Sequence, residues 1–139
     1  MMNLEEIMTS PVETVAPDTS LAEVAKKMLA LEIGLLPVSK GNKIIGIVTD
    51  RDITIRAVAK GLDPERTEVQ EVMTRDVFSC PASSDVTEAC NLMEQKQVRR
   101  LLVIDAANAP IGIVSLADIA LHLRREQSGE VLQRVSQPS

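Results

Sequence analysis

The sequence predicts a mixed α+β fold in which two copies of a β-α-β-β-α unit pack into one pseudo-twofold module. Two observations predict this fold: short motifs recur in the same order in the two halves of the chain, and each half contains a helical spacing of apolar residues followed by a pair of strands. A single unit of about 60 residues would have a marginal hydrophobic core. We therefore expect the two copies to bury their sheets against each other rather than fold independently.

The internal repeat is clearest in two motifs. Residues 6–9 read Glu-Ile-Met-Thr, and they recur 65 positions later, at 71–74, as Glu-Val-Met-Thr. Residues 46–48, Gly-Ile-Val, recur at 112–114 with an offset of 66, because the second hairpin has one additional residue. We interpret the pattern as a duplication. It divides the chain into a first repeat, 3–61, a second repeat, 66–125, and a polar tail, 126–139.

Each repeat is predicted to begin with a short strand and an amphipathic helix. The helices are expected over 20–32 and 85–97, where apolar residues follow the i, i+3, i+4, i+7 spacing of one buried face. The preceding strands are expected over 12–15 and 77–80. The apolar helix positions are Leu21, Val24, Ala25 and Met28 in the first repeat and Val86, Ala89, Cys90 and Met93 in the second.

Two strands and a second helix are predicted to complete each repeat. Aliphatic runs on either side of turn residues indicate the strands, and a polar–apolar pattern indicates the helix. The predicted ranges are 35–38, 44–49 and 50–59 in the first repeat and 101–104, 111–115 and 116–125 in the second.

The composition limits the possible functions. The net charge is −5 and Phe78 is the one aromatic residue, so the chain lacks the basic face and the stacking side chains that hold nucleic acid. No apolar run approaches the roughly 20 residues of a membrane helix. The N-terminus shows no secretory signal, and Cys80 and Cys90 form no metal or redox motif. We expect a cytoplasmic protein that binds neither nucleic acid nor a membrane.

A shared signature lies where each hairpin meets the second helix. Residues 46–52 and 112–118 both read Gly, two β-branched residues, Thr or Ser, two variable residues and Asp. A hydroxyl residue three positions before an acidic one is typical of a capping box, and a helix start needs nothing more. The same groups could hold a nucleotide, because N–H groups at a helix start favour phosphate and a carboxylate can accept from both ribose hydroxyls. The two interpretations are compatible, since a ligand can compete for the cap.

With its repeat, its two Met-Thr segments and its two signatures, the chain resembles tandem CBS domains, a pair often called a Bateman module, over about residues 3–125. The resemblance implies a disc-like unit with two clefts between the repeats, in which many members bind AMP, ADP, ATP or S-adenosylmethionine. It implies a stand-alone, non-enzymatic regulatory module that needs no cofactor and binds an adenine nucleotide, with S-adenosylmethionine or NAD ranked lower. Such a module would form a homodimer and signal to a regulated protein by a conformational change.

The resemblance also assigns roles to individual residues. The ribose would be bound by Asp52 and Asp118. The phosphate would be contacted by the hydroxyls of Thr49 and Ser115. Beside the resemblance, we assign Arg51, Arg99 and Arg100 to the phosphate as well, because a guanidinium matches its geometry. The adenine would be walled by Thr14, Val15, Leu35, Ile47, Ser79, Cys80 and Ile113. Because the arginines stand at different places in the two repeats, we expect two unequal sites, although each arginine could also be a solvated surface charge.

Other interpretations stay open beside the nucleotide site. Asp118 and His122 have metal-ligand spacing on a helix, but two ligands do not make a zinc site. With Ser115 they suggest a hydrolytic triad, yet no nucleophile elbow surrounds the serine. Cys80 could be reactive, although a packed strand thiol suits its position better. Finally, the signatures could cap helices and do nothing else, which would make the chain a purely structural dimerisation module.

Overall fold

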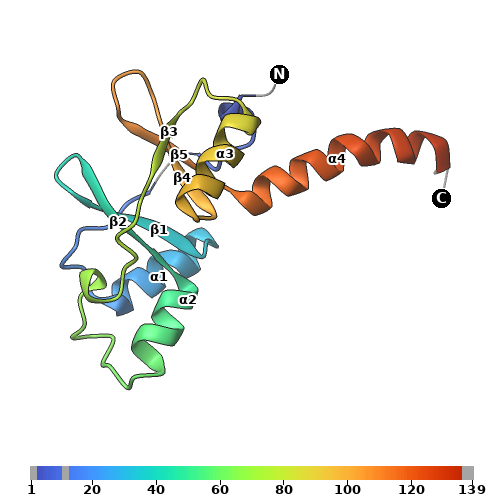
Figure 1. Ribbon diagram of the computed structural model, residues 1–139. Helices are drawn as coiled ribbons and strands as arrows, with labels where there is room; N and C mark the ends of the chain where they lie inside the picture. The colour runs from blue at the N-terminus through green and yellow to red at the C-terminus, as the bar shows by residue number, and fades with distance from the viewer. Residues whose placement is uncertain (1–2, 11–12, 136–139) are drawn as a thin grey trace. The chain divides into compact units, whose positions relative to one another are not determined.

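A computed structural model describes residues 3–10 and 13–135 of the chain (Figure 1). The described residues form two compact units. We call residues 13–77 the first unit, and residues 3–10 together with 78–135 the second unit. The units are offset from the sequence repeats, because the Met-Thr segment near the start of each repeat packs in the unit of the other repeat.

The first unit is built on an antiparallel hairpin. Its strands pair in a register that sets Leu35 opposite Thr49, and Val15 adds a parallel bridge to Val38 on the outer side of β1. On the outer side of β2, Ile47 bridges Thr74. The elements are α1 (Leu21–Leu31), β1 (Leu35–Lys40), β2 (Lys43–Thr49), α2 (Asp50–Asp52), a π-helical stretch (Ile53–Val58) and a 3-10 turn (Val69–Glu71).

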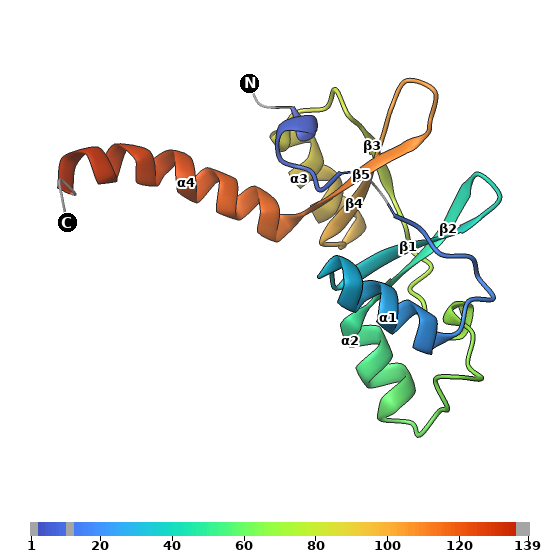
Figure 2. The ribbon, with the colours of Figure 1, turned by 180° about the vertical axis from the view of Figure 1, so that it is seen from behind.

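The second unit repeats this plan. Its sheet has the order β3-β4-β5, with β3 parallel to β4 and β4 antiparallel to β5, and Thr9 bridges Ile113 on the outer side of β5. The final helix leaves β5 as one continuous helix (Figures 1 and 2). The elements are a 3-10 turn (Leu4–Glu6), β3 (Ser79–Pro81), α3 (Val86–Lys96), β4 (Arg100–Ile104), β5 (Pro110–Ser115) and α4 (Leu116–Val135).

These elements confirm the predicted β-α-β-β-α order, with local differences. The predicted strand 12–15 begins at residue 12, which lies outside the described residues, and residue 15 forms a single bridge. The second helix of the first repeat is largely π-helical. In the second repeat α4 continues past the predicted end at Arg125 to Val135, so the backbone of 126–135 is helical, while 136–139 lie outside the described residues.

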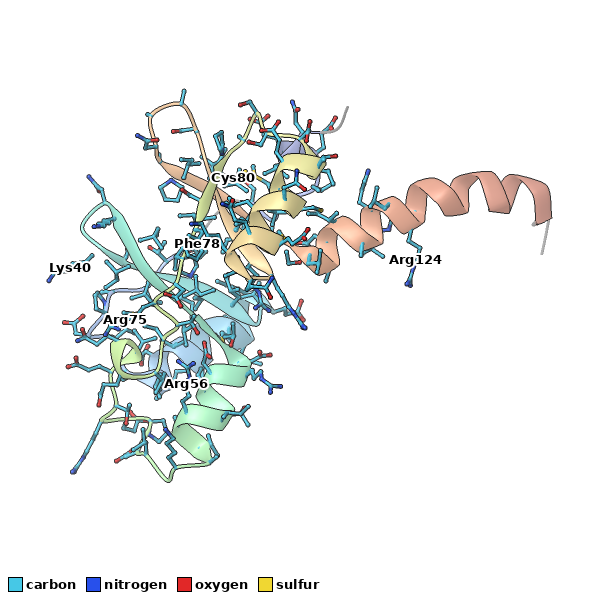
Figure 3. All side chains as sticks on the ribbon, in the orientation of Figure 1. Lys40, Arg56, Arg75, Phe78, Cys80 and Arg124 are labelled. Atoms are coloured by element: carbon cyan, nitrogen blue, oxygen red, sulfur yellow. The ribbon has the colours of Figure 1, made fainter. Side chains whose placement is uncertain are left out.

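Each unit has its own aliphatic core. Leu21, Val24 and Leu36 are fully buried in the first unit, whereas Ala25, predicted on the buried helical face, is exposed. In the second unit Cys80 is 4% exposed and packs in the core, as predicted for a strand thiol; Figure 3 labels it with the nearby Phe78. No helix within the described part of the chain has the length and the apolar character needed to span a membrane.

The glycine of each signature is required by the Met-Thr segment that crosses it. A Cβ atom at Gly46 would lie 2.7 Å from the Met73 sulfur and 2.9 Å from the carbonyl oxygen of Thr74. At Gly112 it would lie 2.5 Å from the Met8 sulfur and 2.9 Å from a backbone carbonyl oxygen. The recurring Met-Thr and Gly motifs are therefore two halves of one packing contact, which holds a Met-Thr segment against the strand that ends in the signature.

Candidate functional site

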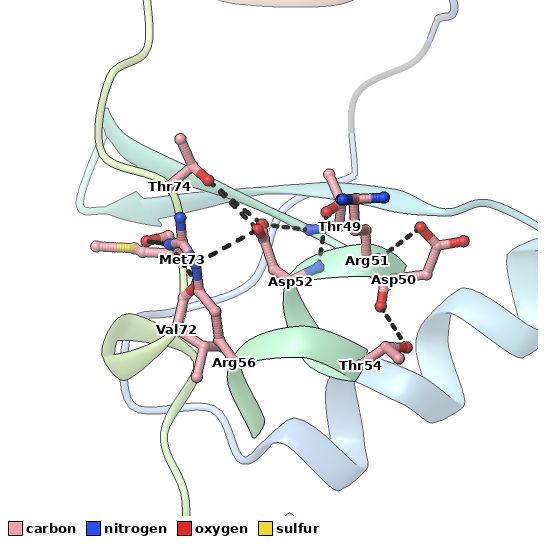
Figure 4. Close-up of polar contacts among 9 residues, drawn as sticks. All are labelled: Thr49, Asp50, Arg51, Asp52, Thr54, Arg56, Val72, Met73 and Thr74. Atoms are coloured by element: carbon pink, nitrogen blue, oxygen red, sulfur yellow. Dashed lines mark hydrogen bonds and ion pairs between the residues drawn. The ribbon is translucent and has the colours of Figure 1, made fainter. Parts of the chain in front are cut away.

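The first strand–helix junction is a capping box. Thr49 ends β2 and accepts the Asp52 N–H on its hydroxyl at 3.0 Å, while the Asp52 carboxylate accepts the Thr49 N–H at 3.0 Å (Figure 4). Thr49 is 8% exposed, so its hydroxyl is committed to the start of the helix. The capping interpretation of the signature is confirmed, with an aspartate in the place usually taken by glutamate.

Asp52 has further partners that the sequence did not suggest. The Thr74 hydroxyl lies 3.5 Å and 3.4 Å from its two carboxylate oxygens, and Arg56 Nε lies 3.9 Å from Oδ1 (Figure 4). Arg56 Nη1 also donates to the carbonyl oxygens of Val72, at 3.2 Å, and Met73, at 3.3 Å. We call this cluster of Asp52, Arg56, Thr74 and the Val72 and Met73 carbonyls the Asp52 latch. It ties the helix that follows β2 to the Met-Thr segment.

One signal in the sequence could have located part of the latch. Arg56 stands four residues after Asp52, which is the spacing of neighbours on a helix. Thr74 belongs to the recurring Met-Thr motif, whose partner strand was not apparent before the packing at Gly46 was known.

The second junction has the same capping geometry. Ser115 ends β5 and accepts the Asp118 N–H at 3.0 Å, and the Asp118 carboxylate accepts the Ser115 N–H at 3.0 Å. Both residues are half-buried. His122 stands where the first repeat has Arg56, since the offset in this part of the chain is 66.

The predicted phosphate-binding arginines lie beside the two junctions. Arg51 is exposed in the first turn of α2. Arg100 is directly opposite Ser115 in the sheet, and the Arg99 carbonyl accepts the Leu116 N–H at 2.8 Å, so both arginines border the second junction. Both are exposed. The structure thus brings two arginines to the second signature and one to the first.

The predicted adenine-wall residues of the first repeat lie on the hairpin and on the segment that bridges its outer side. Leu35 lies opposite Thr49, and Ile47 lies opposite Pro37, two residues along the same hairpin. Val15 bridges Val38 from the other side of β1, and its N–H donates to the Pro37 carbonyl at 3.0 Å. Thr14 and Val15 also line a groove of about 520 Å³. Its remaining lining residues come from the following turn and α1, and are Ala16, Thr19, Glu23, Lys26 and Lys27. Neither Leu35 nor the signature residues line this groove.

In the second repeat the predicted wall residues lie in one sheet. Ser79 and Ile113 both pair with Leu102, from opposite sides of β4. Ser79 is exposed and Ile113 half-buried, whereas the Cys80 side chain is in the core, where a surface ligand would not reach it. Among the residues that the structure describes, no group of three or more His, Cys, Asp or Glu side chains could hold a metal ion.

Comparisons with known proteins agree with this geometry. The family model of the CBS domain matches the chain twice, over residues 4–58 and 69–125. The CBS domain-containing protein YhcV of Bacillus subtilis is 36% identical over 137 residues, covering 98% of this chain and 96% of that protein. Hypoxic response protein 1 of Mycobacterium tuberculosis is 33% identical over 139 residues, covering 99% and 96%.

A solved structure has the same fold. It is the CBS domain pair of protein MJ0100 in complex with 5′-methylthioadenosine and S-adenosyl-L-methionine, with a TM-score of 0.75 and 25% sequence identity over 90% of this chain and 98% of that one. The two matches of the family model and the relatives of more than 30% identity over nearly the full length show that the chain belongs to the CBS-domain family, as a pair of CBS repeats.

Proposed function

We propose that this chain is a regulatory, non-enzymatic module that binds an adenosyl ligand at its strand–helix junctions and signals the binding to a partner protein by a conformational change. The observation that supports this most directly is the hydroxyl–carboxylate pair at both junctions, Thr49 with Asp52 and Ser115 with Asp118. The adenosyl ligands bound to the CBS pair of protein MJ0100 support the same ligand class.

An adenosyl ligand presents the groups that these junctions can bind. Ribose has two neighbouring hydroxyls, and a carboxylate has two oxygens that can accept from both. A serine or threonine hydroxyl can donate to a phosphate oxygen while its own oxygen accepts a backbone N–H. The ligand would share the carboxylate with the cap, because one oxygen of Asp52 and one of Asp118 already accept an N–H.

The arginines favour a ligand that carries phosphate. Arg51 borders the first junction, and Arg99 and Arg100 border the second. A guanidinium matches the geometry of phosphate with two parallel N–H donors. We therefore propose AMP, ADP or ATP as the first candidates and rank S-adenosylmethionine and NAD below them.

We also propose that the working form is a homodimer. Leu29 of α1 is 80% exposed and Val58 of the π-helical stretch is 65% exposed, and both belong to the first unit. Exposed large apolar side chains on helices are typical of surfaces that another chain covers. The regulated protein would then be a separate chain that distinguishes the ligand-bound from the ligand-free module.

A thermal-unfolding panel tests the proposed function. The purified protein, freed of bound nucleotide, is heated with AMP, ADP, ATP, NAD, S-adenosylmethionine or a GTP control. A ligand that binds only the native state adds about 2.7 kcal/mol at a hundred times its Kd. For a chain of this size that corresponds to a Tm increase of roughly 5–10 °C. We expect an increase with the adenosyl compounds, and its absence with all of them would refute the proposal.

A double variant locates the binding. Asp52→Ala with Asp118→Ala should abolish the ligand-induced increase in Tm, because both ribose acceptors are lost. The matched control is Asp85→Ala, which removes an equivalent capping carboxylate, 2.9 Å from the Glu88 N–H at the start of α3, but no proposed ligand contact. Equal affinity in the double variant and the control would contradict the assigned residues.

A further inference from the structure

We infer that the two junctions are unequal: the Asp52 latch closes the first, and the second, at Asp118, is the one that takes the ligand. The inference rests on the proposed function, because it assigns the adenosyl ligand to one of its two candidate positions. It comes from a difference between two otherwise equivalent capping boxes.

Both oxygens of Asp52 are already engaged. Oδ2 accepts the Thr49 N–H at 3.0 Å and lies 3.4 Å from the Thr74 hydroxyl, while Oδ1 lies 3.5 Å from that hydroxyl and 3.9 Å from Arg56 Nε. The Asp52 side chain is 12% exposed. A ribose would therefore exchange existing hydrogen bonds for new ones, and such an exchange gains little free energy.

The second junction has a threonine, Thr9, at the place of Thr74, but it has no arginine at the place of Arg56. Arg56 bridges one carboxylate and two backbone carbonyls, which the several N–H donors of a guanidinium permit. His122 takes this place in the second repeat, and an imidazole has at most two N–H donors, so it cannot bridge the same three acceptors. Ser115 is also half-buried, whereas Thr49 is 8% exposed.

The surrounding charges favour the second junction for an anionic ligand. In the first unit Asp50 follows Thr49 and its carboxylate accepts the Arg51 N–H at 2.8 Å, which places a second negative charge at the start of the helix. At the corresponding place the second unit has Leu116. Arg99 and Arg100 border the second junction, where the first repeat has a glycine and a leucine. The first junction has Arg51, where the second repeat has an alanine, and Arg56, which is held in the latch.

A calorimetric titration with AMP tests the inference. The wild type should bind one AMP per chain, and Asp118→Asn should weaken binding at least tenfold. In the Asp118→Asn background, adding Arg56→Met and Thr74→Val should restore a site, because the Asp52 carboxylate is then released. The control, Asp118→Asn with Arg66→Met, removes an exposed ion pair to Asp63 instead and should restore nothing. Two equal sites in the wild type, or unchanged affinity in Asp118→Asn, would overturn the inference.

The Tm measured without ligand tests the latch independently of the proposed function. Without ligand, Arg56→Met should lower Tm by roughly 2–5 °C, whereas Arg66→Met should change it by less than about 1 °C. If the wild type binds none of the adenosyl compounds, the proposed function fails, and this comparison still decides whether the latch exists. Equal Tm values for the two variants would refute the latch. If the triple variant does not fold, Thr74→Val alone in the Asp118→Asn background carries the same test with a smaller gain.

Discussion

The first and second units share the backbone contacts of their strand–helix junctions but differ in the side chains around them. The Asp50 N–H donates to the Gly34 carbonyl at 2.9 Å, and in the second unit the Leu116 N–H donates to the Arg99 carbonyl at 2.8 Å. The two donors, Asp50 and Leu116, occupy equivalent positions of the repeats, and so do the two acceptors, Gly34 and Arg99. The residue type differs in both pairs. The comparison shows that a contact made by the backbone leaves the side chain free to diverge, and the charges of the two sites have diverged in this way.

The helix that follows each junction differs as well. In the first unit α2 has three residues and passes into a π-helical stretch, where the Ala59 N–H donates to the Thr54 carbonyl, five residues earlier. Gly61, with a φ of 72°, ends the helical backbone. In the second unit α4 runs for 20 residues. The same capping signature therefore starts a helix in both units, while the residues after it decide how the helix continues.

Among the substitutions that compare the two units, truncation of equivalent core side chains should lower the free energy of unfolding most. Leu36 is 0% exposed in the first unit and Leu101 is 1% exposed in the second. We expect Leu36→Ala and Leu101→Ala each to lower the free energy of unfolding by about 3 kcal/mol, because each leaves a cavity among well-packed neighbours. Urea titration measures this, and Lys43→Ala, at an exposed position of β2, should stay within about 0.5 kcal/mol of the wild type. A loss below about 1 kcal/mol in one unit would show that its core is loosely packed.

Substitution of the two signature glycines should cause a loss of stability of intermediate size, and it compares the packing of the Met-Thr segment in the two units. Gly46→Ala and Gly112→Ala should each destabilise the protein by about 2 kcal/mol, since the added methyl group meets a backbone carbonyl oxygen at 2.9 Å that cannot move cheaply. Gly41→Ala is the control, because its φ of 64° costs about 1 kcal/mol for any other residue while the space around it is open. Chemical denaturation of the three variants should rank both signature glycines above the control, and the reverse order would contradict the packing with the Met-Thr segments.

Patterns among residues close in sequence predicted most of the fold and the capping pairs of the candidate site, but not the contacts of the Asp52 latch. The helix faces, the hairpins and the pairing of Thr49 with Asp52 depend on residues at most a few positions apart, so spacing alone predicted them. The contacts of Arg56 with Val72 and Met73 span 16 and 17 positions and follow no period. For the same reason the sequence did not reveal that each Met-Thr segment packs in the unit of the other repeat.

The smallest predicted effect is a stabilisation at the ends of α1 and α3. Glu32 and Gln97 have φ values of 55° and 56° and occupy the same position of the two repeats, although side chains disfavour this left-handed backbone. We expect Glu32→Gly to raise the free energy of unfolding by about 0.5 kcal/mol, because glycine adopts this conformation without steric cost but gains freedom in the unfolded chain. Gln97→Gly should gain less, because it also loses the hydrogen bond from Gln97 Nε2 to the Glu94 carbonyl at 2.7 Å. Ala30→Gly, two residues before the first of these positions and inside α1, should instead destabilise by about 1 kcal/mol. A lower Tm for both glycine variants would show that side-chain contacts hold the left-handed caps in both units. A lower Tm for one variant alone would show that the two units differ in these contacts, although their backbones agree there.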